Sequence, residues 1–245
     1  VNLLRVDPFS APGKLGRGNI HKHSNSSDEG LDPAEVARRY QVEGYDFLAM
    51  TDHFLGLYDY PLTDIQSSEN ENFKTILGAE LHTGAMENGE IWHLVAVGLP
   101  KDFMPPDAPD FQPHTHQETA VEIAQRARDA GAFVVVAHPE WSQMSLTDAA
   151  SIKAAHAIEV YNHGCRAGCD RGSGFQVYEQ LLLMGQKLML CATDDAHFNE
   201  PDHFGGWVMV KAVENSRSFI LTALKEGSYY SSMGPDFHNV IWSDN

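Results

Sequence analysis

Short apolar runs alternate with amphipathic stretches along most of the chain. Strand-like runs fall near Ile20 and within residues 45–53, 73–81, 91–99, 133–139, 157–163, 187–197 and 207–212. The stretches at 32–45, 117–132, 147–156, 175–185 and 216–227 have the spacing of helices. Continuously apolar strands separated by helices are typical of a parallel sheet that is covered on both faces. Six or more such units in one chain predict a barrel.

Local signals support these boundaries. Asp32 is placed as the N-cap of the first helix, with Pro33 in its first turn. Gly131 is the expected stop of the helix over 117–132. Asn88-Gly89 is a strong turn signal between the strands at 73–81 and 91–99. We expect the proline-rich segment 100–116 to be a surface loop, and the whole chain, 1–245, to form a single domain.

Composition narrows the function classes. No run approaches the roughly 18 apolar residues of a membrane span. Three cysteines, Cys165, Cys169 and Cys191, are too few for a disulfide framework, and we interpret them as thiols in a reducing, cytoplasmic compartment. Removal of a leader before Val1 is left open.

The net charge of −17 argues against a nucleic-acid or anionic-membrane partner. A small anionic substrate is compatible with this net charge if bound metal ions supply a local positive potential. The oligomeric state is not predicted.

Histidines and acids recur where the predicted strands end. In a parallel barrel, functional residues lie at these ends. His21 and His23 are two residues apart, so both imidazoles face the same side of an extended chain and can reach one ion. His114 and His116 share this spacing but fall in the predicted surface loop. The positions at or just beyond apolar runs are His21, His23, Asp52, His53, Glu80, His138, Asp195 and His197.

The order of these segments resembles the motifs of the PHP (polymerase and histidinol phosphatase) family of metallohydrolases. The resemblance spans about residues 18–200, and its motifs are "NIHKHSNSSDEG", "FLAMTDH", "GAEL", "WHLVAVGL", "VVVAHP", "IEVYN" and "ATDDAH". The strand–helix–strand segment at 205–245 is similar to the branch named after a carbaryl-hydrolysing enzyme. The resemblance implies a distorted (β/α)7 TIM-like barrel that binds two or three divalent ions of zinc, manganese or iron.

The resemblance also implies a set of metal ligands. A first ion would be held by His21, His23, Glu80 and Asp195. A second would share Glu80 and add His93 and His138. A third would take Asp28, His53 and His197. Asn19 replaces an aspartate that the family often has before the first histidine, and we expect it to affect only the support of that ligand. The segment "SDEG" leaves open whether Asp28 or Glu29 ligates.

We therefore expect a metal-dependent hydrolase, and specifically a phosphoesterase that uses a metal-bridging hydroxide. Glu80 and Asp195 would be essential, and Asp52 would orient a ligand or the nucleophile. His163 is a candidate proton donor. Arg166 and Arg171 are candidate phosphate ligands in the segment "NHGCRAGCDRGSG", which we expect to be a glycine-rich loop after a strand end. His82 faces either the pocket or a loop. The alternatives are a carbamate, carboxyl ester or amide hydrolase, a 3'-5' exonuclease-type phosphodiesterase and a non-catalytic metal-binding module.

Overall fold

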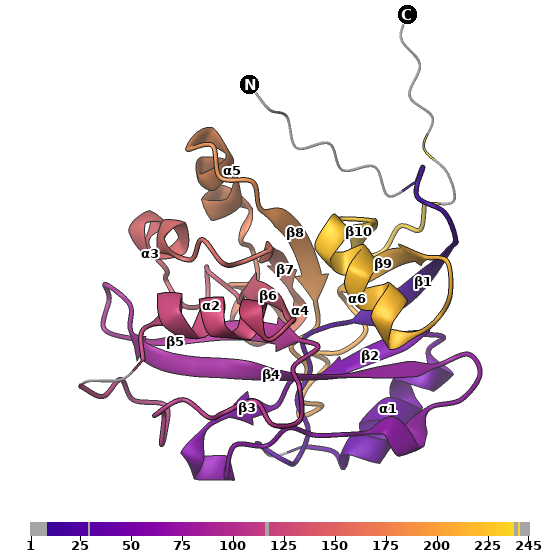
Figure 1. Ribbon diagram of the computed structural model, residues 1–245, viewed down its shortest axis with the longest axis horizontal. Coiled ribbons are helices and arrows are strands. Elements are labelled where there is room, and N and C mark those ends of the chain that lie inside the picture. The colour runs from indigo at the N-terminus through magenta and orange to yellow at the C-terminus, as the bar shows by residue number, and fades with distance from the viewer. Residues whose placement is uncertain (1–8, 29, 116–117, 238–239, 241–245) are drawn as a thin grey trace, which may run out of the picture.

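One curled sheet carries the fold in the computed structural model, which describes residues 9–28, 30–115, 118–237 and 240. Nine strands follow one another in the order β10-β9-β1-β2-β4-β5-β6-β7-β8, and β3 pairs with β4 beside this path. Strand β8 also contacts β9 and β10, so the two ends of the path meet and the sheet nearly closes (Figure 1). The predicted TIM-like barrel is confirmed.

The strands have the following bounds: β1 (Lys14–Asn19), β2 (Phe47–Met50), β3 (His53–Phe54), β4 (Lys74–Ala85), β5 (Ile91–Val97), β6 (Phe133–Val136), β7 (Ala157–Asn162), β8 (Met189–Thr193), β9 (Trp207–Ala212) and β10 (Tyr229–Ser232). The α-helices are α1 (Pro33–Val42), α2 (Ala120–Asp129), α3 (Leu146–Ser151), α4 (His163–Cys169), α5 (Phe175–Leu183) and α6 (Arg217–Glu226). Two short 3-10 helices lie at Gly56–Tyr58 and Gln66–Ser68.

The sheet is mixed, so the expectation of a purely parallel sheet is wrong. Strand β5 runs antiparallel to β4 and β6, and β9 runs antiparallel to β1 and β10. The reversal into β5 follows from the predicted turn, in which Gly89 has a φ of 87° and donates its N–H to Met86 O at 3.0 Å. A turn of this length joins only antiparallel neighbours.

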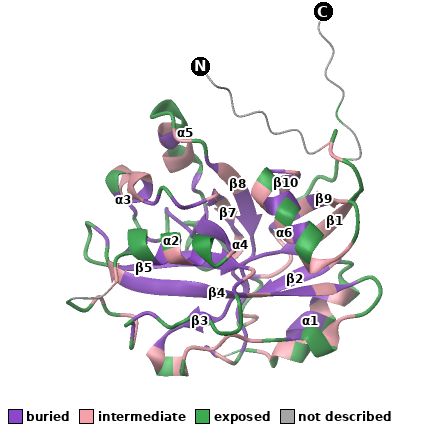
Figure 2. Cartoon of the chain, in the orientation of Figure 1, coloured by how far each residue is buried: buried purple, intermediate pink, exposed green. Residues whose placement is uncertain are grey.

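Both faces of the strands are buried. In β6, Val134 and Val136 pack in a cluster with Ile123 of α2. The alternate residues Phe133 and Val135 pack in a second cluster, which includes Ile220 and Leu224 of α6. Figure 2 shows buried strands and helices whose outer faces are exposed. Burial of each such aliphatic side chain contributes about 1.5–3 kcal/mol, which explains the continuously apolar runs.

The helices largely follow their predicted signals. Asp32 accepts a hydrogen bond from Ala34 N at 2.9 Å and caps α1, and Gly131, with a φ of 97°, follows α2. Helix α3 is shorter than the predicted 147–156. Residues 163–169, expected to be a glycine-rich loop, form α4, because the side chain of Asn162 accepts a hydrogen bond from Cys165 N at 2.9 Å. No helix in the described ranges has the length and apolar character needed to cross a membrane.

Candidate metal centre

The predicted ligands gather at one edge of the barrel. His21, His138 and Asp195 each lie two residues beyond the end of a strand, namely β1, β6 and β8. Glu80 lies inside the long strand β4. His93 is near the beginning of β5 rather than its end, and it reaches the same edge because β5 runs antiparallel to β4. The mixed sheet therefore brings these side chains together.

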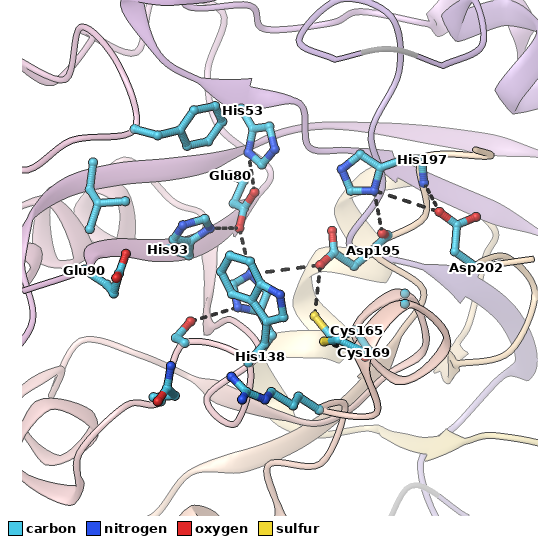
Figure 3. A pocket seen from close by; sticks show the side chains of 18 of the residues that line it. His53, Glu80, Glu90, His93, His138, Cys165, Cys169, Asp195, His197 and Asp202 are labelled. Atoms are coloured by element: carbon cyan, nitrogen blue, oxygen red, sulfur yellow. Dashed lines mark hydrogen bonds and ion pairs between the residues drawn. The ribbon is translucent and has the colours of Figure 1, made fainter. Parts of the chain in front are cut away.

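Glu80 is the centre of the cluster. Its Oε1 lies 2.8 Å from His93 Nδ1 and 3.1 Å from His138 Nε2. Its Oε2 lies 2.6 Å from His53 Nδ1. Figure 3 shows the three imidazoles around this one carboxylate, which is fully buried. Glu80 is thus placed to bridge neighbouring ligand groups.

His21 and His23 converge on Asp195, as their spacing predicts. Their Nε2 atoms lie 3.2 and 2.9 Å from Asp195 Oδ1 and 3.3 Å from one another. The residue between them, Lys22, points the other way, and its ammonium donates to the carbonyl of Ala196. Asp195 has a φ of 52°, a conformation that non-glycine residues adopt at a cost and that is often found at functional sites.

Asp28 is the centre of another group, on the other side of His23. Its Oδ2 lies 3.2 Å from His53 Nε2, 3.6 Å from His197 Nε2 and 3.7 Å from His23 Nδ1. His23 therefore faces this group with one ring nitrogen and Asp195 with the other. The sequence left open whether Asp28 or Glu29 is the ligand. Asp28 lies in the cluster, and Glu29 lies outside the described residues.

These residues fit divalent metal ions. The ligand atoms within each group of three or four lie within 4.8 Å of one another. A tetrahedral ion about 2.1 Å from each ligand atom holds those atoms about 3.4 Å apart, which is close to the separations in the Asp28 group. The buried His23 Nδ1 has no hydrogen-bond partner among the described residues. A bound cation would satisfy it.

The electrostatics prepare some of the ligands for a cation, but not all of them. Burial by itself would raise the pKa of Glu80 and of Asp195, but the surrounding imidazoles hold both values well below the usual range. Burial lowers the pKa of His23 to about 3, helped by the neighbouring His53 and His197. The carboxylates are therefore ionised and His23 is neutral, which leaves lone pairs free for a cation.

Burial would lower the pKa of His21, His53 and His138, but the neighbouring carboxylates raise all three. These imidazoles would therefore have to release a proton when a cation binds.

His82 joins the cluster from β4. Its Nε2 lies 2.9 Å from His53 Nδ1 and 3.7 Å from Glu80 Oε2, and the side chain is fully buried. Burial, followed by the charge of His93, lowers its pKa well below the usual value. The sequence left its orientation open. The structure turns it toward the ligands, as its i, i+2 spacing from Glu80 in a strand permits.

Glu159 supports the ligands, a role that the sequence did not reveal. Its Oε1 accepts hydrogen bonds from His21 Nδ1 at 2.7 Å and Thr193 Oγ1 at 2.8 Å. Its Oε2 accepts from the backbone N–H of His138 at 2.8 Å and from Asn162 Nδ2 at 3.0 Å. Such a carboxylate fixes the orientation of a ligand imidazole. The sequence feature that could have indicated this role is a single acid inside the apolar run "AIEVYN".

Asp52 holds a loop and does not face the ligands directly. Its carboxylate accepts hydrogen bonds from Ser24 N at 2.6 Å, from Ser27 Oγ at 3.1 Å and from the Thr63 hydroxyl. These contacts fix the serine-rich segment that ends in Asp28. Anchoring this loop agrees with the expectation that Asp52 orients a ligand, and a role in orienting the nucleophile stays a prediction.

The loop that carries His197 is anchored in the same way. Asp202 Oδ2 accepts a hydrogen bond from His197 N at 2.6 Å. Asp194 accepts one from Tyr40 Oη at 2.6 Å and others from the backbone N–H groups of residues 204–206. Asn19, as expected, supports a ligand: its Oδ1 accepts from His21 N at 3.1 Å.

The cluster is the floor of a cavity of about 820 Å³. Arg171 lines this cavity, as do Gly164, Cys165, Gly168 and Cys169 of α4. Arg166 does not line it and pairs with Asp170. His163 also lies outside the lining, with its Nδ1 2.9 Å from Tyr161 Oη. Helix α4 explains both corrections, because it turns positions 163 and 166 away from the face formed by 164, 165, 168 and 169.

The fold is shared with several solved structures, although no protein-family model and no curated protein matches the chain. A two-domain protein from Bacteroides vulgatus, containing a predicted PHP-like metal-dependent phosphoesterase, has a TM-score of 0.63 at 20% identity over 95% of this chain and 70% of its own. A candidate metal-dependent phosphoesterase from Bifidobacterium adolescentis has a TM-score of 0.52 at 16% identity (75% and 89% covered).

An amidohydrolase from Chromobacterium violaceum, solved with bound sulfate and no metal, has a TM-score of 0.55 at 16% identity over 76% of this chain and 89% of its own. At these identities the similarity concerns the arrangement of the backbone. The chain therefore has the fold of PHP-like phosphoesterases and of an amidohydrolase.

Proposed function

We propose that the protein is a metal-dependent hydrolase of the PHP family that cleaves a small phosphate ester. The position of Glu80 supports this proposal most directly. One buried carboxylate contacts imidazoles that belong to different ligand groups, with His93 and His138 at one oxygen and His53 at the other. A purely structural site would be closed by its own ligands, whereas this cluster opens into a cavity.

The proposed ligand sets keep the assignment that the resemblance implies. His21, His23, Glu80 and Asp195 would hold one ion, and Glu80 with His93 and His138 a second. Asp28, His53 and His197 would hold a third, which His23 also faces. Their nitrogen and oxygen donors suit zinc, manganese or iron(II). When bound, such ions supply an activated water and positive charge that offsets the buried carboxylates.

The chain's own groups would bind and orient the ester. Arg171 is the only lysine or arginine in the cavity lining within the described residues, and its guanidinium can bind two phosphate oxygens at once. Hydrolysis consumes one water, breaks the bond between phosphorus and the ester oxygen, and releases an alcohol and inorganic phosphate. The exposed carboxylates Glu90 and Glu200 also line the cavity, and they disfavour polyanions such as nucleic acids.

A carbamate, carboxyl ester or amide hydrolase is the second candidate. Part of the cavity wall is uncharged, with Met86, Ile91, Phe111 and Trp141 in the lining. A neutral substrate would need no guanidinium, and the same ligand groups would serve its hydrolysis. The contribution of Arg171 to substrate binding therefore separates the two candidates.

The test is a hydrolysis panel on protein reconstituted with zinc, manganese or iron(II). It includes phosphate monoesters and diesters, carbamates, carboxyl esters and amides. We expect monoester turnover that Glu80→Gln and Asp195→Asn abolish, while Glu35→Gln, a change in an exposed ion pair of α1, leaves it intact. Turnover of only carbamates, carboxyl esters or amides would transfer the assignment to the second candidate. Activity that survives both ligand changes would refute the metal mechanism.

A further inference from the structure

Two aromatic side chains approach the metal centre from separate loops. Trp141 follows β6, and its ring centroid lies 4.9 Å from that of His138 and 5.5 Å from that of His93. The indole remains 43% exposed and lines the cavity. Its segment is fixed next to the ligand, because Ser142 Oγ lies 3.0 Å from His138 Nδ1.

Phe111 comes from the proline-rich loop, far from Trp141 in sequence. Its ring centroid lies 4.9 Å from that of His53 and 5.4 Å from that of His82. Backbone hydrogen bonds from Gly56 N to Ala108 O and from Leu57 N to Pro109 O hold this loop next to β3. Phe111 is half-buried and also lines the cavity. Aromatic surface is therefore present beside two different ligand groups.

The nearby wall is apolar as well. Met86 and Ile91, at the two ends of the β4–β5 turn, are buried and line the same cavity. The cavity volume of about 820 Å³ exceeds what a phosphate group and its ligands need, and it suits an organic molecule of moderate size. Apolar walls with a few polar groups are typical of sites that bind the body of a ligand.

We propose that the alcohol part of the substrate carries a planar aromatic ring, which binds against Trp141 and Phe111 while the phosphate faces Glu80. This inference rests on the proposed phosphoesterase function. Two aromatic walls favour a ring over an alkyl group of equal size, because aromatic pairs gain attraction beyond the area that they bury. This gain corresponds to about a two- to tenfold preference for each ring contact.

Benzyl phosphate and cyclohexylmethyl phosphate test this proposal. Both contain the same number of carbon atoms and release a primary alcohol, so the chemical step is matched and the planarity of the ring differs. We expect the metal-reconstituted protein to hydrolyse benzyl phosphate with a kcat/KM about three- to tenfold higher. Trp141→Leu and Phe111→Leu should each move this ratio toward one.

Phe175→Leu is the matched control, because Phe175 of α5 is 50% exposed and does not line the cavity. It should leave the ratio unchanged, and thermal melting should show that all three variants fold. Equal kcat/KM for the two esters in the unmodified protein would overturn the inference while the phosphoesterase function stands. So would Leu variants that lower both values equally.

A binding measurement separates failure of the inference from failure of the proposed function. If no phosphate ester of the hydrolysis panel is cleaved, the proposed function fails, and calorimetric titration with benzylphosphonate and cyclohexylmethylphosphonate decides the inference. Tighter binding of the benzyl compound, lost in Trp141→Leu and retained in Phe175→Leu, would support an aromatic ligand at this wall. Equal affinities would overturn it.

Discussion

Glu159 Oε1 accepts a hydrogen bond from Nδ1 of His21 at 2.7 Å. Both side chains are fully buried, and the bond leaves Nε2 of His21 directed at Asp195. The imidazole thus has a fixed orientation before any ion binds. The same carboxylate also accepts the backbone N–H of His138, so one residue positions ligands from two groups.

Glu159→Gln should weaken metal binding although Glu159 contacts no ion. The amide keeps one acceptor but loses the charge and the second acceptor, and loss of such a partner typically costs about 10- to 100-fold in metal affinity. Zinc titration against a competing chelator measures the change. Glu35→Gln is the charge-matched control at the surface. Unchanged zinc affinity would show that Glu159 is needed only for packing.

Arg171→Gln should raise KM for phosphate esters, because Arg171 lines the cavity. Loss of a charge-assisted contact of about 1.5–3 kcal/mol corresponds to roughly 10- to 150-fold in kcat/KM. Arg166→Gln is the matched control from the preceding helix α4, since Arg166 pairs with Asp170 outside the cavity. Steady-state kinetics on both variants decides the point. Equal effects of the two changes would remove Arg171 from the binding site.

His82→Leu should lower the metal content of the Asp28 group. His53 Nδ1 lies 2.9 Å from His82 Nε2, and this contact helps to direct His53 Nε2 at Asp28. His82→Gln should restore binding, because its amide oxygen can take the place of Nε2. Elemental analysis after reconstitution measures ions per chain. Equal stoichiometry in the Leu variant and the unmodified protein would contradict this positioning role.

Metal should also stabilise the fold. A ligand at 100 times its dissociation constant adds about 2.7 kcal/mol to the free energy of unfolding. For a chain of this size that corresponds to about 5–10 °C in Tm. Differential scanning calorimetry with and without zinc gives the shift, and Asp195→Asn should reduce it. An identical Tm in chelator and in zinc would mean that the cluster binds no ion tightly.

The gathering of several predicted ligands could be foreseen from the sequence, because strand ends and i, i+2 spacing determine where a side chain points, whereas Asp28 and His93 were indicated only by the resemblance of the motifs. His21, His23 and Asp195 come together for this reason. The residues around α4 could not. A segment with several glycines resembles a loop, yet the side-chain cap of Asn162 begins a helix there. One helical turn then decides which residues face the cavity, and hydrophobic patterning does not reveal this rotation.

Glu159 shows a second limit of the sequence. An acid inside an apolar strand can face either side, and only the pairing of β7 with its neighbours places it next to His21. The antiparallel direction of β5 was signalled by its turn but was not carried into the prediction of the sheet. Both differences arise from contacts between segments that are distant in sequence.

His156 should make the stability of the fold depend on pH, independently of the metal ligands. Its Nδ1 accepts a hydrogen bond from Val134 N at 3.0 Å, and its ring stacks on Phe133. Burial, together with the charges of Arg128 and Lys225, lowers its pKa from 6.5 to about 4. Between these values the unfolded chain binds a proton that the folded chain does not bind. The stability that neutral His156 contributes to the fold is therefore complete above pH 6.5 and is lost as the pH falls toward 4.

The variant His156→Asn tests this pH dependence, because asparagine keeps an acceptor that does not titrate. The urea midpoint of the variant should therefore fall less than that of the unmodified protein between pH 7 and about pH 4.5. Because the cluster histidines titrate in both proteins, the difference between the two curves isolates His156. Parallel curves would contradict this assignment.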